Sequence, residues 1–481
     1  MRPMRVLFIY KDVTLTEPMG ILYLASALQA AGHDVALALS ARPDFEARLR
    51  EFAPDVVGYS ITTGFHPYYL ALNRRVKDML GRPVVAVVGG PHATFFPEVV
   101  EEEGVDVVCR GEGEETIVDL VEALSRGEDH TAIPNLWVKE NGAVHRNELR
   151  PLVCELDRLA FPARELLYDY DPYMHDVTLK HFFSSRGCPY LCTYCFNHKF
   201  NELYRGKGEI IRHRSVDNVL AEIDDVRARY PLKFVRFLSD NFTMSREWVA
   251  EFADKYSRDV ALPFNCHVRA NLIDAAVAAD LGRAGCHSVL LGVETGDDYL
   301  RNEVLKRKMS RETIVEACRY LRENGVNVYT QNIIGLPGET FEQALATLKL
   351  NQDCRPAFAW ASLFMPYPAT ELAQYAVAGG HFDGDYDRVF HTFHRHSVLR
   401  FDDERTRRRL TNLHKLFGVM VEWPLLGRFA RALCSLPPNP LYSAVFKLWY
   451  GYTNRRRIFP YPVGVKGFLA GVKRFFRKDE A

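Results

Sequence analysis

Three cysteines within one short stretch are the residues of this chain best suited to chemistry. Cys188, Cys192 and Cys195 occur in the segment Ser-Ser-Arg-Gly-Cys-Pro-Tyr-Leu-Cys-Thr-Tyr-Cys-Phe-Asn, with the spacing C-x3-C-x2-C and an aromatic residue, Tyr194, before the last cysteine. The flanking glycine and proline indicate a loop. Three thiolates on one loop can hold three irons of a cubane cluster and leave the fourth iron without a protein ligand. Such an open metal position is what a reactive site needs.

Two structural interpretations compete with a cluster: three buried cysteines, or half of a zinc site. A four-cysteine zinc site usually has a second cysteine pair at short range, whereas the next cysteine in this chain is Cys266. We therefore favour an iron–sulfur cluster. Ten cysteines without a signal peptide at the N-terminus indicate a reducing compartment, the cytoplasm, rather than a disulfide scaffold.

The composition is that of an ordinary globular protein. The chain has 481 residues, of which 47% are hydrophobic and 25% charged, enough for two or three domains. Its formal net charge is zero, so the total charge gives no reason to expect a nucleic-acid partner. No apolar run approaches the roughly 20 residues that a membrane-spanning helix needs.

The N-terminal part predicts an α/β fold with a doubly wound, flavodoxin-like parallel sheet. Short apolar strands, expected at 5–10, 34–39, 55–60, 83–90 and 105–109, alternate with helical stretches. Ligands of such sheets bind beyond the carboxyl ends of the strands. The candidate binding residues in the loops at those ends are Ser60, Thr62, Thr63, Gly89, Gly90, Pro91, His92, Gly111 and Glu112.

The middle of the chain predicts a partial (β/α)6 barrel. Strands are expected at 178–184, 234–238, 264–269, 287–291, 326–334 and 359–364, and polar residues follow most of them. In barrels these strand ends carry the chemistry. We expect an N-terminal domain at 1–140, a proline-containing linker at 141–176, the barrel at 177–380 and a mainly helical region of unknown role at 381–481.

The cysteine spacing resembles the signature of the radical S-adenosylmethionine (SAM) superfamily. The resemblance implies a 4Fe–4S cluster whose open iron chelates the amino and carboxylate groups of SAM. The reduced cluster then cleaves SAM to a 5′-deoxyadenosyl radical. It further implies an external electron donor such as flavodoxin or ferredoxin.

The resemblance also implies which residues bind SAM. They are Tyr194, Asp240, Asn241, Arg269, Glu294, Arg311 and Gly335. Asp240 and Asn241 stand where the family contacts the methionyl amino group, Glu294 where it contacts the ribose or the methionyl part, and the turn from Gly335 where backbone groups meet adenine. The two arginines are assigned to the SAM carboxylate from charge alone. Taken singly, Asp240 could be a helix N-cap, Glu294 a surface charge and Gly335 part of an ordinary turn.

The N-terminal sheet resembles the cobalamin-binding domain of one large radical SAM subgroup, in which loops of small residues lie against the corrin ring. The size of the ligand explains the small residues, since a flat macrocycle needs loops without large side chains. The D-x-H-x-x-G motif that supplies a histidine to cobalt in another cobalamin family is absent, because Lys11–Thr16 contains no histidine. The resemblance therefore implies base-off cobalamin without a histidine ligand. Alternatively, this is a flavodoxin-like domain with another ligand or none, and His92 only forms hydrogen bonds.

Together these resemblances imply a cobalamin-dependent radical SAM enzyme that methylates an unactivated carbon of a small-molecule or lipophilic intermediate. One alternative is a radical ring cyclase or rearrangement enzyme without methyl transfer, as in the anaerobic tetrapyrrole ring cyclases. A methylthiotransferase acting on RNA or protein is disfavoured, because that family carries a second cysteine trio in its N-terminal domain. The same region here offers only Cys109 and Cys154.

The C-terminal tail mixes apolar and cationic residues at helical spacing. From Val463 to Arg477 this pattern indicates either a helix packed on the barrel or an interfacial helix. The second interpretation predicts a peripheral contact with a membrane.

Overall fold

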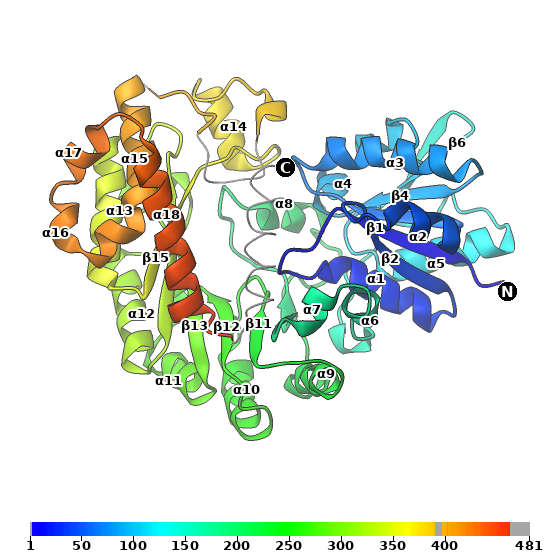
Figure 1. The fold of residues 1–481 in the computed structure, drawn as a ribbon, viewed down its shortest axis with the longest axis horizontal. Coiled ribbons are helices and arrows are strands. Elements are labelled where there is room, and N and C mark those ends of the chain that lie inside the picture. Colours follow the sequence, from blue (N-terminus) through cyan, green and yellow to red (C-terminus); the bar gives the residue numbers. More distant parts are fainter. Residues whose placement is uncertain (1, 390–396, 402, 462–481) are drawn as a thin grey trace. The chain divides into compact units, whose positions relative to one another are not determined.

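The computed structural model describes residues 2–389, 397–401 and 403–461 (Figure 1). These residues form two compact units: the first comprises residues up to 177 together with 204–209, and the second comprises 178–203 and 210 onward. Within the described ranges, no helix combines the length and apolar character needed to cross a membrane.

The first unit is a doubly wound sheet, as the sequence predicts. Five parallel strands have the order β2-β1-β3-β4-β5, which is flavodoxin-like. The strands are β1 Arg5–Tyr10, β2 Asp34–Leu39, β3 Val56–Ser60, β4 Val85–Gly89 and β5 Val107–Cys109. The helices between and after them are α1 Met19–Ala30, α2 Phe45–Phe52, α3 His66–Leu80, α4 Pro91–Phe95 and α5 Glu114–Arg126.

A hairpin extends this sheet into the segment that we expected to be a linker. The strands β6 Leu136–Glu140 and β7 Ala143–Arg146 add antiparallel to β5. Asn141 and Gly142 connect them with φ angles of 51° and 79°, the left-handed pair of a type I′ turn. The linker prediction for 141–176 is therefore replaced by a boundary near residue 177. The Asn-Gly dipeptide is a strong hairpin signal that the sequence analysis missed.

The remainder of that segment is held by buried polar contacts. It contains the short helices α6 Glu165–Tyr168 and α7 Pro172–Asp176. Tyr168 donates a hydrogen bond to Glu17 (2.6 Å) and accepts one from Arg164 (3.2 Å). Asp171 pairs with Arg42 at 2.6 Å. Because a buried charge needs a partner, these contacts fix the segment on the first unit.

The second unit is the expected partial barrel. Its six parallel strands follow one another in chain order, β8-β11-β12-β13-β14-β15. They are β8 Leu179–Phe182, β11 Phe234–Phe237, β12 Phe264–Val268, β13 Cys286–Glu294, β14 Asn327–Ile334 and β15 Phe358–Leu363. A separate antiparallel pair joins β9 Ser185–Arg186 to β10 Arg212–His213.

The helices of the barrel begin where the sequence supplies caps. They are α9 Val216–Arg229, α10 Arg246–Asp259, α11 Ala275–Arg283, α12 Arg311–Glu323 and α13 Phe341–Cys354. The side chains that accept backbone N–H groups at their first turns belong to Ser215, Ser245, Asp274, Ser310 and Thr340. Each such cap stabilises its helix by about 1 kcal/mol. Beneath α10, the Phe237 ring lies 4.9 to 5.7 Å from those of Phe242, Phe252 and Phe264.

The described chain after the last barrel strand is mainly helical, and this includes the region 381–481, as predicted. Its helices are α14 Glu371–Ala378, α15 Glu404–Glu422, α16 Pro424–Gly427, α17 Ala430–Ser435, α18 Pro440–Thr453 and a π-helical turn at Asn454–Ile458. The α15 residues Leu410, Leu413 and Phe417 pack in one buried cluster with Ala359 and Ala361 of β15. The tail segment Val463–Arg477 lies outside the described residues.

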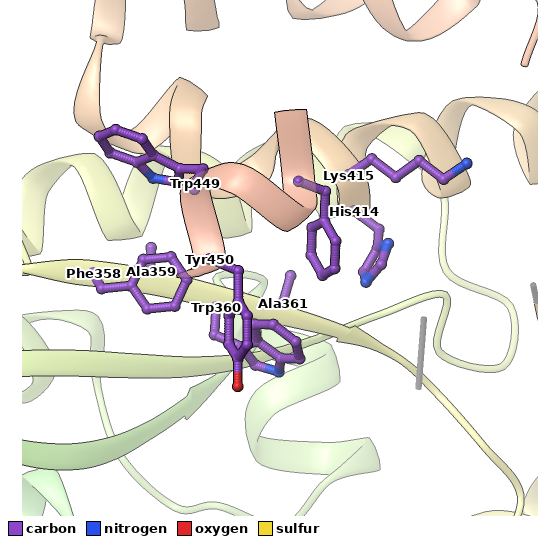
Figure 2. Close-up of a pocket in the computed structure, with 10 residues that line it drawn as sticks. Phe358, Ala359, Trp360, Ala361, His414, Lys415, Trp449 and Tyr450 are labelled. Carbon is purple, nitrogen blue, oxygen red and sulfur yellow. The ribbon is translucent and has the colours of Figure 1, made fainter. Parts of the chain in front are cut away.

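A small cavity lies where α15 and α18 cross β15. Figure 2 shows Trp360 of β15 facing Tyr450 of α18, and their ring centroids are 4.8 Å apart. His414 and Lys415 of α15 also line the cavity. The cavity measures about 10 Å³, which is close to the smallest volume that holds one water molecule. It is a packing defect rather than a ligand site.

Candidate active site

The three cysteines lie on the loop between β9 and the helix α8 Phe196–Leu203, in the second unit. The loop leaves β9 at Gly187, whose φ is 91° and where a Cβ would lie 1.9 Å from the Ile210 carbonyl oxygen. Only glycine fits there. Farther along, the Thr193 hydroxyl donates to the Val304 carbonyl (2.8 Å), which anchors the loop.

The thiols lie together in a largely buried place. Cys192 is buried and the other two are half-buried. Burial raises the pKa of Cys188, and raises the pKa of Cys195 to about 12. Thiols in such surroundings are neutral until a metal takes their protons. Among the residues that the structure describes, no three His, Cys, Asp or Glu side chains converge in the way a single metal ion needs. A cubane cluster does not need its ligands to converge on one metal ion, because each thiolate binds a different iron.

Two arginines donate to the sulfur of Cys192. The distances from Nη1 to Sγ are 3.5 Å for Arg269 and 3.8 Å for Arg307. Arg269 is oriented by Asn271, which accepts from its Nε (2.7 Å), and by the Tyr190 ring, 3.8 Å below its guanidinium. Donors aimed at a ligating sulfur and nearby positive charge suit an anionic iron–sulfur cluster. The residues present therefore fit the expected group.

Tyr194 links the cysteine loop to the end of β13. Its hydroxyl donates to Glu294 Oε1 (2.8 Å) and accepts from Arg307 Nη1 (3.0 Å). Arg307 and Glu294 also form an ion pair at 3.8 Å. Burial opposes the charge on Arg307, but Tyr194 and Glu294 raise the pKa of its guanidinium above the ordinary value. Glu294 is therefore a buried carboxylate that contacts the cysteine loop through Tyr194, and not a surface charge.

Asp240 holds the two ends of the cysteine loop. Its carboxylate accepts from the Gly187 backbone N–H (3.1 Å) and from the Asn197 side chain (2.9 Å). It does not cap a helix, since Ser245 caps α10. Asn241 is buried and turns away to accept from the N–H and hydroxyl of Thr243, at 3.2 and 3.1 Å.

The turn that follows β14 is organised by Glu339. One carboxylate oxygen of Glu339 accepts from the backbone N–H groups of Gly335 (2.5 Å) and Leu336 (3.1 Å). These two donors, which we expected to face adenine, are thus already used within the protein. In the described part of the chain the other oxygen has no hydrogen-bond partner.

Arg311 lies apart from this group of side chains. It begins α12 and pairs with Asp353 of α13. Arg307, four residues earlier in the sequence Lys-Arg-Lys, occupies the place beside Cys192. Charge alone could not separate these two arginines. The only available signal was that Arg307 lies in the loop after β13, where barrels place functional groups, and Arg311 inside a helix.

The candidate cobalamin loops lie at one edge of the first unit's sheet. Ser60 ends β3, Gly89 ends β4, and the two following loops are joined by a hydrogen bond between Thr63 Oγ1 and His92 Nδ1 (3.0 Å). The His92 ring stacks on His66 at 4.1 Å. Burial, and secondarily His66, lowers the pKa of His92 to about 4. His92 is therefore a neutral imidazole.

Two glycines of these loops are required by the fold itself. Gly90 has a φ of 90°, and a Cβ there would lie 2.7 Å from Ser60 Oγ. A Cβ on Gly111 would lie 1.7 Å from the hydroxyl oxygen of Tyr204, which also accepts from the Glu112 N–H (3.2 Å). Both glycines are therefore required because neighbouring protein segments pack closely against them. We had expected them to be required by the space that a macrocycle needs. The edge remains lined by small residues, which fits a flat ligand.

The arginine assignment gives a first prediction. Arg307→Lys keeps the positive charge but loses the planar fork that reaches Cys192, Tyr194 and Glu294, so we expect roughly 10- to 100-fold slower reductive cleavage of SAM. Arg311→Lys is the matched control and should behave as the wild type. Anaerobic assays with reconstituted protein and a chemical reductant measure this. Equal activity of the two variants would contradict the assignment.

Glu339 gives a prediction about pH. Burial raises the pKa of Glu339 to about 8, so the folded state holds a proton that the unfolded state releases near pH 4.5. The resulting stabilisation is complete below about pH 4 and is lost as the pH rises towards 8. In Glu339→Gln, the fall in unfolding free energy between about pH 5 and 8 should shrink by on the order of 3 kcal/mol. Urea unfolding at both pH values tests this, with the exposed Glu316→Gln on α12 as control. An unchanged fall in Glu339→Gln would contradict the prediction.

Comparisons with known proteins agree with this geometry. Residues 182–350 match the model of the radical SAM superfamily, and residues 9–121 match that of the B12 binding domain. An uncharacterized methyltransferase of Pyrococcus horikoshii is 31% identical over 76% of this chain and 79% of its own. The anaerobic magnesium-protoporphyrin IX monomethyl ester cyclase of Rubrivivax gelatinosus is 27% identical over 77% of this chain and 70% of its own.

Solved structures support the fold. The cobalamin-dependent SAM radical enzyme OxsB, with aqua-cobalamin bound, superimposes with a TM-score of 0.67 at 14% identity, covering 94% of this chain and 71% of that chain. The resemblance drawn from the cysteine spacing and the N-terminal sheet is thus confirmed. The chain belongs to the radical SAM superfamily, within the group that carries an N-terminal B12-binding domain.

Proposed function

We propose that this cobalamin-dependent radical SAM enzyme methylates an unactivated carbon of a small-molecule or lipophilic biosynthetic intermediate. The observation that carries the proposal is the combination, in one chain, of a three-cysteine loop backed by Arg269 and Arg307 with a B12-binding unit. The Pyrococcus relative, which bears the name methyltransferase, adds support.

In this proposal Cys188, Cys192 and Cys195 hold the 4Fe–4S cluster. When bound, the cluster supplies the electron that cleaves SAM, and cobalamin supplies a carrier for the methyl group. Asp240 fixes the loop at both ends, so the thiols keep their spacing. An external donor such as flavodoxin or ferredoxin delivers the electron.

The same residues orient SAM in this proposal. Glu294 offers a carboxylate to its ribose or methionyl part, and Arg269 offers a cation to its carboxylate. Tyr194 and Arg307 hold the Glu294 side chain in place, since a buried carboxylate is costly without such partners. Asn241 supports the turn that carries Asp240.

A radical ring cyclase that uses cobalamin without methyl transfer is the second candidate. The Rubrivivax relative bears a cyclase name and matches this chain over a similar length. Both reactions need the same cysteine loop and the same B12-binding unit. The two candidates differ in the fate of the methyl group of SAM.

The deciding experiment follows that methyl group. With SAM labelled on the methyl carbon and intermediates of the neighbouring genes' pathway as substrates, we expect label in the product. A ring-closed product without label would favour the cyclase. The variant with Cys188, Cys192 and Cys195 all changed to Ala should lose both the iron–sulfur absorbance and SAM cleavage while remaining folded. Cys266→Ala should keep both, because Cys266 lies in the core of β12.

Cobalamin is proposed to bind base-off and without a histidine ligand. The loop directly after β1, residues 11–16, contains no histidine. His92 forms a hydrogen bond with Thr63 and stacks on His66. The electron paramagnetic resonance spectrum of the Co(II) form should therefore lack nitrogen splitting from an axial base. Nitrogen splitting that disappears in His92→Gln would show that His92 ligates cobalt and refute this part of the proposal.

A further inference from the structure

Large apolar side chains that are exposed are concentrated in the C-terminal helical region of the described chain. Eight of the twelve exposed large apolar side chains lie between residues 423 and 452. They are Trp423, Leu425, Leu426, Phe429, Leu436, Leu441, Leu448 and Tyr452. We call them the C-terminal apolar surface. Monomeric proteins rarely expose contiguous patches of this kind unless something binds there.

These side chains lie on neighbouring helices or directly beside their ends. In Figure 1 the orange and red helices α16, α17 and α18 gather around α15 on one side of the second unit. The Tyr442 hydroxyl of α18 donates to the Leu433 carbonyl of α17 (3.0 Å). The Trp423 ring lies 4.8 Å from that of Trp449, which lies 5.8 Å from that of Tyr452.

Packing of α18 against the barrel does not account for its outward residues. Its inner face meets β15 through Phe446 and Tyr450, whose rings lie 5.5 and 4.8 Å from that of Trp360. Figure 2 shows Tyr450 and Trp360. Leu441 and Leu448 lie on another face, two helical turns apart, and are 66% and 75% exposed. The helix is thus apolar on two faces and uses only one.

The charge of this region differs sharply from that of the whole chain. The formal net charge of the chain is zero, yet the sequence from 423 to 478 contains eleven Lys or Arg and no Asp or Glu. Those that the structure shows as exposed are Arg428, Arg431, Lys447, Arg455 and Arg456. Arg431 and Arg457 pair with acids outside the segment, Glu342 and Glu422. The segment that carries the apolar surface is therefore cationic and exposes several of its cations.

This combination selects one class of partner. A second copy docked by two-fold symmetry would bring the same cationic border against itself, which costs free energy. Nucleic acid prefers aromatic platforms, whereas five of the eight exposed side chains are leucines without a π face. Leucines that enter the acyl boundary, Trp and Tyr at the headgroup level and Arg or Lys beside anionic headgroups are the features of interfacial helices.

We propose that the C-terminal apolar surface, carried by α16, α18 and the residues that flank α16 and α17, seats the protein on the surface of an anionic lipid bilayer. The inference is independent of the proposed reaction. It concerns other residues than the tail segment Val463–Arg477, to which the sequence analysis assigned a membrane contact.

The test is co-sedimentation of the full chain with vesicles at low salt. The wild type should pellet with vesicles of phosphatidylcholine and phosphatidylglycerol, and less with phosphatidylcholine alone. Changing Leu425, Leu441 and Leu448 together to Ser should weaken the partition by roughly tenfold or more, because their apolar burial is lost. The matched control changes three exposed residues elsewhere, Tyr299, Tyr375 and Val377, to Ser, and should bind as the wild type.

Two further variants distinguish the sources of binding. Arg428→Glu with Arg456→Glu should remove the preference for anionic vesicles. A chain that ends at Tyr461 should retain most of the binding. Circular dichroism and thermal unfolding verify that every variant is folded.

Several results would overturn the proposal. They are a wild type that does not pellet at low salt, equal pelleting of the triple leucine variant, and loss of binding only when the chain ends at Tyr461. A wild type that forms dimers disrupted by the leucine changes, without binding vesicles, would instead assign this surface to a second copy.

Discussion

The guanidinium of Arg307 is the group around which the candidate active site is arranged. One planar side chain reaches Cys192 of the cysteine loop, Tyr194 beside it, Glu294 at the end of β13 and the Gly292 carbonyl. A buried cation without partners would be costly, and these contacts together offset that cost. The backbone near Glu294 adopts an unusual conformation that places this carboxylate. Glu294 has a φ of 66°, in the left-handed region, and a Cβ added to Gly292 would lie 2.4 Å from Glu294 Oε1. An unfavourable conformation at a functional site is stable only when its surroundings impose it.

The barrel supplies those surroundings at the carboxyl ends of its strands. Asp240 follows β11, Arg269 follows β12 and Glu294 ends β13. Parallel strands in chain order carry the three side chains to the same edge, next to the loop that follows β8 and β9. Asp240 then holds that loop by two hydrogen bonds, and Arg269 and Arg307 supply positive charge to its sulfur. The thiols can therefore be buried and still receive the charge that a cluster needs.

The sequence predicted the strands well because each is a short apolar run bounded by polar or small residues, and burial on both faces demands that pattern. It predicted the site less completely. Arg311 and Arg307 carry the same charge four residues apart, and only tertiary packing decides that one meets Asp353 and the other Cys192. The sequence also could not predict why glycine is required at positions 90 and 111. The atoms that exclude a Cβ there belong to Ser60 and to Tyr204, which are distant in the sequence. The hairpin at Asn141 was predictable from its turn residues alone.

A net charge of zero describes the whole chain but no particular surface of it. Residues 423–478 contain no Asp or Glu, so this region is cationic although the net charge of the whole chain is zero. The helix α18 sharpens the point: Lys447 is its one charged residue. A helix that is apolar nearly all round is stable in water only when it is buried on most sides. The barrel covers the side of Phe446 and Tyr450, while Leu441 and Leu448 remain exposed. At 66% and 75% exposure those leucines bury little surface within the protein, so a surface outside the protein, one that also attracts Arg and Lys, accounts for their presence.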